Sequence, residues 1–211
     1  MIKALLAGTK TQTRRLIKPK KGDGTFDVVH DGEGNITDIQ AKNEHGEHIG
    51  TVRCPYGQPG DRLWVRETLT DLGGDGTWYY AADKEPLALD DYTGILMSEK
   101  PTIPSIFMPR VASRILLDIV EVRAERVQSI TEADAVAEGI LYFGRDQRPG
   151  GQDRYKHYGK YKNPSAEPIH AAFNGVLAKK SYETLWASIN GDESWDSNPW
   201  CWVVKFRRVE A

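Results

Sequence analysis

The spacing of apolar and polar residues predicts strands over most of this chain. After the Pro-Gly-Asp turn at 59–61, the segment 62–67 alternates leucine and valine with tryptophan and arginine, as a half-buried strand does. Two short apolar runs, 26–29 and 35–39, flank an Asp-Gly-Glu-Gly turn and predict a hairpin. Further strands are predicted by the aromatic and aliphatic runs at 77–81, 114–123 and 200–209.

Helical patterns are fewer. Residues 1–8 predict a short helix with an apolar face and a closing glycine, and no strand pattern precedes it, so either the fold begins there or an opening strand is missing. The clearest helix follows Thr131, an N-cap residue, carries acidic residues in its first turn and stops at Gly139. A further helix is expected within 170–190.

These elements predict an α+β fold, a small mixed β-barrel with helices at its mouth. Helices do not alternate with strands, which argues against a parallel doubly wound sheet. No linker divides the chain, so we expect a single domain over 1–211. Long polar insertions are expected at about 20–53, 83–108 and 141–169, the last as a mobile surface segment.

Composition narrows the classes of function. The chain has 211 residues, a formal net charge of −2, 39% hydrophobic residues and a mean hydropathy of −0.54, which predicts a modest core. The balanced charge argues against a domain that coats nucleic acid by bulk electrostatics. Two separate cysteines and five scattered histidines predict neither a metal nor a cofactor. Without a signal peptide or an apolar run near the roughly 20 residues that span a bilayer, we expect a cytoplasmic protein.

The segment 8–15 is chemically the richest, because it holds one amine, two hydroxyls and two guanidiniums after a glycine. If it forms a helical turn, Lys10 comes within hydrogen-bond reach of Thr13. A desolvated lysine amine could then take the hydroxyl proton and make the oxygen a nucleophile. The alternative is a solvated basic turn that ends a helix, with its cations near the last carbonyls.

The order of these motifs resembles the ASCH domain family, whose members have a PUA-like β-barrel. The runs Thr-Gln-Thr-Arg-Arg at 11–15 and Ser-Ile-Asn-Gly with Trp-x-x-Asn-Pro-Trp at 188–200 resemble members carried by phages and prophages. The N(4)-acetylcytidine amidohydrolase branch carries Leu-Ala-Gly-x-Lys-Thr-x-Thr-x-Arg, and residues 6–15 are similar to it at each of these positions. The resemblance covers most of the chain outside the insertions.

This resemblance implies an amidohydrolase that cleaves the acyl amide on the exocyclic amine of N(4)-acylated cytosine or cytidine, without metal or cofactor. The catalytic lysine, threonine and glutamate of that branch fall on Lys10, Thr13 and Glu138. Many family members carry glutamate in place of Thr13, and RNA binding is expected of those. The alternatives are therefore an RNA- or DNA-binding module without catalysis, or a weak ribonuclease.

Two mechanisms stay open for these three residues. Thr13 could attack the acyl carbon, with Glu138 as proton shuttle and with Lys10 as base if burial and Arg15 lower the pKa of the lysine. Alternatively, Thr13 could donate a hydrogen bond to the acyl oxygen while Lys10 or Glu138 activates a water. A carboxylate in the last turn of a helix opposes the helix dipole, and Lys10 is a candidate for the compensating partner.

Further residues are expected to contact the substrate without reacting. The two arginines could bind a sugar or a phosphate, although one of them is expected to be a structural ion-pair partner. Glu67, at the end of its strand, could pair with Arg15. Trp195, in a loop, could stack on a base. The predicted substrate contacts are Thr11, Arg14, Arg15, Glu67, Tyr142, Phe143 and Trp195. The expected partner is a modified nucleoside or base, with RNA as the second candidate and no membrane. The chain is expected to be a monomer or a homodimer.

Overall fold

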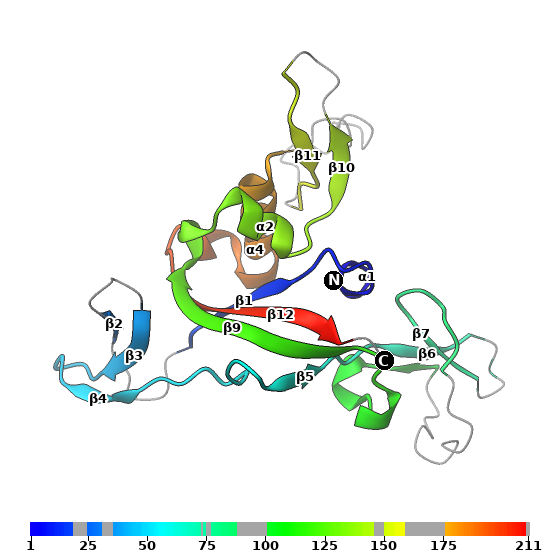
Figure 1. The fold of residues 1–211 in the computed structure, drawn as a ribbon, viewed down its shortest axis with the longest axis horizontal. Helices are drawn as coiled ribbons and strands as arrows, with labels where there is room; N and C mark the ends of the chain where they lie inside the picture. The colour runs from blue at the N-terminus through cyan, green and yellow to red at the C-terminus, as the bar shows by residue number, and fades with distance from the viewer. Residues whose placement is uncertain are drawn as a thin grey trace.

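The centre of the molecule is a curled antiparallel sheet of four strands in the order β1–β12–β9–β5 (Figure 1). The computed structural model describes residues 1–18, 25–30, 36–72, 74, 77–87, 101–145, 150–158 and 176–209. The four strands are β1 (Gln12–Leu16), β5 (Arg62–Trp64), β9 (Leu116–Arg126) and β12 (Trp200–Val209). The long strands β9 and β12 pair along their lengths, with a register shift between Lys205 and Phe206.

Alternation along β12 sends neighbouring side chains to opposite faces of the sheet, where they join different apolar clusters. Cys201 packs with buried residues of α2 (Glu132–Ala137) and α4 (Ala178–Asn190). Val204 packs instead with Leu5 of the first helix, α1 (Ile2–Leu6), and with aliphatic side chains of β9. The central sheet is therefore covered by helices and carries apolar contacts on both faces.

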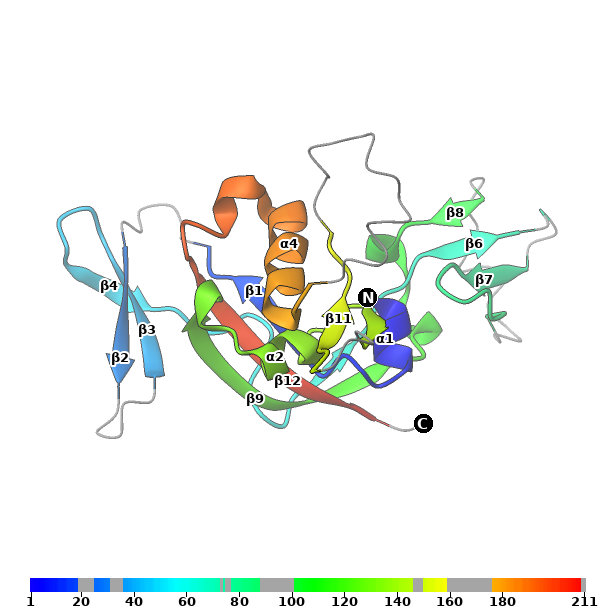
Figure 2. The same ribbon diagram turned by 90° about the horizontal axis from the view of Figure 1, so that it is seen from above.

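Smaller sheets extend this centre. Figures 1 and 2 show two three-stranded sheets near opposite ends of β9 and β12, and a two-stranded hairpin beside α2 and α4. Their strands are β2 (Thr25–His30), β3 (Ile36–Lys42) and β4 (His48–Thr51); β6 (Leu69–Asp71), β7 (Trp78–Tyr80) and β8 (Thr102–Ile103); and β10 (Tyr142–Arg145) with β11 (Asp153–Tyr155). Short 3-10 turns are η1 (Ser105–Phe107), η2 (Arg110–Ala112), η3 (Val127–Ser129) and η4 (Asp192–Ser194).

Several elements confirm the sequence predictions. The expected hairpin is the β2–β3 pair, and the last strand has the predicted bounds. The Thr131 hydroxyl accepts a hydrogen bond from the Asp134 N–H at 3.0 Å, which confirms the N-cap of α2. The fold is mixed and rich in strands with few helices, as predicted. Within the described residues, no helix has both the length and the apolar character to cross a membrane.

One prediction of local structure was wrong. The basic segment is not a helical turn, because Gln12–Leu16 forms strand β1 and pairs with Lys205–Cys201 of β12. The open edge of a neighbouring strand supplies backbone hydrogen bonds that a short isolated turn lacks. Within the insertion expected at 141–169, the described residues form the β10–β11 hairpin, while 146–149 and 159–169 lie outside the described residues.

Candidate active site

Two glycines bring the start of β1 against the end of α2. The chain leaves α1 through Gly8, which has a φ of +70°, a conformation that glycine adopts without strain. Lys10 then forms an isolated β-bridge with Glu138. Gly139 has a φ of +76°, and a Cβ atom there would lie 2.7 Å from the Lys10 Cβ. The residue after Glu138 therefore has to be small for the two segments to touch.

The Lys10 amine is buried in a site with three oxygen acceptors. Its Nζ donates to the backbone carbonyls of Gln12 and Glu138, both at 2.8 Å, and to the Glu138 Oε2 at 3.1 Å. Three acceptors match the three donors of an ammonium group. Burial lowers the pKa of Lys10, the Glu138 carboxylate opposes that shift, and the Arg15 and Arg14 charges add to it. The lysine is thus a buried cation that loses its proton more easily than a surface lysine.

Glu138 shares its carboxylate between two cations. It is the C-cap residue of α2 and is only 6% exposed. Its Oε2 faces Lys10, and its Oε1 accepts from the Arg14 Nη1 at 3.4 Å. A carboxylate at this end of a helix is disfavoured by the helix dipole, and the two cations offset that cost.

The Thr13 hydroxyl lies apart from this pair. Side chains alternate along β1, so Thr13 faces away from Gln12 and Arg14. Its Oγ1 is buried and has no hydrogen-bond partner. The structure therefore joins Lys10 to Glu138, while the third predicted catalytic group makes no hydrogen bond to either of them.

The two neighbouring arginines have different surroundings. Arg14 is 2% exposed and forms ion pairs with three carboxylates, so it is the structural ion-pair partner expected of one arginine and not a substrate contact. Arg15 is exposed, and its Nη1 donates to the Arg14 carbonyl at 3.3 Å. Thr11 is also exposed, and its backbone N–H donates to the Ala137 carbonyl. Of this group, Arg15 and Thr11 remain accessible to a ligand.

Three residues of the site were not among the predicted site residues. Glu125 accepts from the Arg14 Nη2 at 2.8 Å, and Asp134 accepts from the same atom at 3.4 Å. With its amide nitrogen toward Asp134, Gln12 donates to the Asp134 Oδ1 at 3.1 Å and accepts from Arg14. The i,i+4 spacing of Asp134 and Glu138 places both on one face of α2, a signal that the sequence did contain.

The remaining predicted substrate contacts lie elsewhere, and the proposed pairing of Glu67 with Arg15 is wrong. Both carboxylate oxygens of Glu67 accept from Arg114, each at 2.9 Å. Trp195 is buried in the cluster under α4, with its ring centroid 6.4 Å from that of Tyr182, so the prediction of an open stacking surface is also wrong. A tryptophan in a loop still buries its ring when a helix offers an apolar face.

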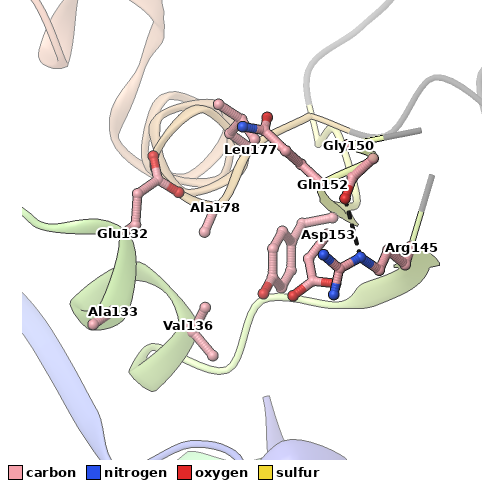
Figure 3. Close-up of a pocket in the computed structure, with 11 residues that line it drawn as sticks. Glu132, Ala133, Val136, Arg145, Gly150, Gln152, Asp153, Leu177 and Ala178 are labelled. Carbon is pink, nitrogen blue, oxygen red and sulfur yellow. Dashed lines mark hydrogen bonds between the residues drawn. The ribbon is translucent and has the colours of Figure 1, made fainter. Parts of the chain in front are cut away.

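Tyr142 and Phe143 are exposed on β10 and line neither of two pockets in the molecule. A pocket of about 510 Å³ lies between α2, the start of α4 and the β10–β11 hairpin (Figure 3), and a second of about 340 Å³ lies beside Trp202. In the first, Arg145 donates to the Gly151 carbonyl at 3.0 Å, drawn as a dashed line in Figure 3. Its α2 residues lie on the helix face opposite Glu138, so the pocket is separate from the Lys10 site.

No family model, no curated protein and no solved structure matches this chain. Among the residues that the structure describes, no group of three or more histidine, cysteine, aspartate or glutamate side chains is arranged to hold a metal ion. The site itself offers a buried amine, a buried carboxylate in contact with it, and two exposed residues of the same segment, Thr11 and Arg15.

Proposed function

We propose that this chain is an amidohydrolase that removes the acyl group from the exocyclic amine of N(4)-acylated cytosine or cytidine. The observation that supports it most is the buried contact between the Lys10 amine and the Glu138 carboxylate, with the lowered pKa of the lysine. A base and an acid in contact are what amide hydrolysis needs. The resemblance of residues 6–15 to the amidohydrolase branch of the ASCH family supports the choice of substrate.

The reaction consumes one water. Water adds its oxygen to the acyl carbon, the bond between that carbon and N4 breaks, and N4 gains a proton, which yields a carboxylic acid and the free cytosine amine. The cytosine ring withdraws electron density from the departing nitrogen, so this amide is easier to cleave than an alkyl amide. Proton transfer is therefore the part of the reaction that most needs catalysis.

The Lys10–Glu138 pair can supply both proton transfers. A proton moves across the 3.1 Å contact from the Lys10 Nζ to the Glu138 Oε2, which leaves a neutral amine and a carboxylic acid. The amine then takes a proton from the attacking water, and the acid gives its proton to N4. Both groups return to their starting charges, so no further donor or acceptor is required.

The geometry favours the mechanism in which water attacks. The Thr13 hydroxyl has no hydrogen bond to a base that could take its proton. Thr13 faces away from the pair because side chains alternate along β1, so we assign it no part in the chemical step, and we assign the exposed Arg15 to the sugar or to a phosphate of the substrate.

The test is turnover of N(4)-acetylcytidine by the purified chain, followed by ultraviolet absorbance and by chromatography of cytidine and acetate. We expect turnover without added metal and none with Lys10→Ala. Lys3→Ala, which changes an exposed lysine on α1, is the matched control and should keep wild-type turnover. Turnover by Lys10→Ala would reject the assignment.

The same preparation separates the alternative functions. Binding of labelled RNA that weakens steeply with salt, without conversion of the nucleoside, would replace the proposal with a nucleic-acid-binding module. Cleavage of the RNA that is lost in Lys10→Ala would replace it with a ribonuclease.

A further inference from the structure

Arg14 connects the candidate site to the central sheet. Its guanidinium is enclosed between the sheet and α2, with its Cζ 6.0 Å from the ring centroid of Tyr182 on α4. One nitrogen, Nη1, faces the Glu138 carboxylate, and the other, Nη2, faces Glu125 on β9. Because β12 lies between β1 and β9, this side chain reaches across a whole strand. A substrate cannot contact it while these partners surround it.

The contact with Glu138 restricts how that carboxylate can turn. Oε1 is held by the Arg14 Nη1 at 3.4 Å, and Oε2 is held by the Lys10 Nζ at 3.1 Å. With one oxygen on each cation, rotation about the last side-chain bond of Glu138 breaks both contacts. A guanidinium suits this role because its nitrogens lie in a rigid plane, whereas an ammonium is a single point of charge.

Arg14 is itself held in place. The Gln12 amide and the Asp134 carboxylate contact its guanidinium. The shortest ion pair of Arg14 is with Glu125, at 2.8 Å. Arg123 on β9 supports the same carboxylates from the other side, because it pairs with Glu125 at 2.5 Å and with Asp134 at 3.6 Å. Arg62 on β5 is exposed and pairs with Asp118, so among the described contacts it shares none of these carboxylates and serves as the control.

We propose that Arg14 is a positioning residue, which holds the Glu138 carboxylate in the orientation that faces the Lys10 amine. The inference rests on the proposed function for its kinetic consequence, and its structural part can be measured without turnover. The sequence predicts Arg14 as a substrate contact, whereas in this proposal Arg14 affects the reaction through Glu138.

The kinetic test compares Arg14→Lys and Arg14→Met with Arg62→Met. A misplaced catalytic group costs rate even when it is present, so we expect kcat to fall by about tenfold or more in both Arg14 variants, with KM nearly unchanged. Arg62→Met should keep kcat within about twofold. In a Glu138→Gln background, Arg14→Lys should cause no further loss, because the two residues act in one unit. Arg14→Lys keeps the positive charge, so it tests positioning even if Arg14→Met does not fold.

The second readout is hydrogen exchange of the Lys10 ammonium protons, followed by NMR of lysine labelled with ¹⁵N. Protons held by three oxygens exchange slowly, so we expect a protected signal in the wild type and in Arg62→Met, and its loss in Arg14→Lys. If the wild type shows no turnover, the proposed function fails and this measurement alone decides the inference. Protection that survives in Arg14→Lys, or a loss of kcat that multiplies with that of Glu138→Gln, would overturn it.

Discussion

Two buried glutamates, Glu67 and Glu138, are held by arginines in different ways. Glu67 is 1% exposed, and one guanidinium, that of Arg114, satisfies both of its oxygens at 2.9 Å. The same guanidinium lies 3.7 Å from the ring centroid of Tyr80 and pairs with Asp83, and its hydrogen bonds to Glu67 and then to Asp83 raise the pKa of Arg114. We call this cluster closed, because one guanidinium binds both oxygens of the acid and an arginine does not readily lose its proton.

Glu138 instead contacts an arginine through one oxygen and a lysine through the other. These contacts are longer than those of Glu67, at 3.4 Å to Arg14 and 3.1 Å to Lys10. Its lysine is buried, which lowers the pKa of Lys10, whereas no such amine lies among the contacts of Glu67. Burial of an acid therefore does not by itself mark a reactive site. A buried acid next to a group whose proton can move is the more informative signal.

The largest expected difference between the two clusters is catalytic. Glu138→Gln should lower turnover of N(4)-acetylcytidine by about 10² to 10⁴-fold, because the amide can neither accept the lysine proton nor give one to the leaving amine. Glu67→Gln, the same change in the closed cluster, should keep turnover within about threefold of wild type once folded protein is compared. Initial rates at saturating substrate measure both. Equal losses of turnover in the two variants would contradict the proposed difference between the two clusters.

The second expected effect is on stability. Glu67→Gln should lower the free energy of unfolding by on the order of 3 kcal/mol, because it leaves Arg114 partly buried without its main anionic partner. Urea denaturation followed by circular dichroism measures the change. Arg62→Gln, which affects an exposed ion pair with Asp118, should change the same quantity by less than about 1 kcal/mol. A loss from Glu67→Gln as small as that of the surface pair would contradict the closed cluster.

A smaller effect tests how the segments of the candidate site touch. Gly139→Ala should destabilise the chain more than Gly8→Ala, although both glycines have a positive φ. The backbone strain of each change is about 1 kcal/mol. Only at Gly139 would the new methyl meet a neighbour, the Lys10 Cβ at 2.7 Å, whereas nothing lies within 4 Å at Gly8. Urea denaturation of the two variants measures the difference in their free energies of unfolding. Equal losses of stability would mean that Lys10 moves away from the new methyl group at no energetic cost.

The smallest expected effect is the pH dependence of stability. Because the pKa of Lys10 is lower in the folded chain than its usual 10.5, the unfolded chain binds more protons between those two values. The free energy of unfolding therefore gains a term that increases as pH rises through the folded pKa and is complete near pH 10.5. Lys10→Met should lack that gain, while Lys3→Met should keep it. Urea midpoints of the three proteins across the alkaline range provide the check.

Elements with a strong local signal were predictable. The apolar runs at 114–123 and 200–209 identified β9 and β12, and Thr131 identified the start of α2, because alternation and capping depend on a few adjacent residues. Strand β1 was missed because four of its five residues are polar or basic and form no apolar pattern, and because its partner β12 lies at the far end of the chain. Trp195 was misassigned because burial depends on what packs over a loop.

The reactive groups can be read from the sequence: an amine at Lys10, a hydroxyl at Thr13, a guanidinium at Arg14 and a carboxylate at a helix end. Which of these groups come into contact depends on the tertiary structure. Lys10 and Glu138 are 128 positions apart, and they touch because a strand and a helix end pack together through a glycine. Thr13 is three positions from Lys10, yet its hydroxyl faces elsewhere because side chains alternate along a strand. Proximity along a chain is set by covalent bonds, whereas proximity in space is set by backbone pairing and packing.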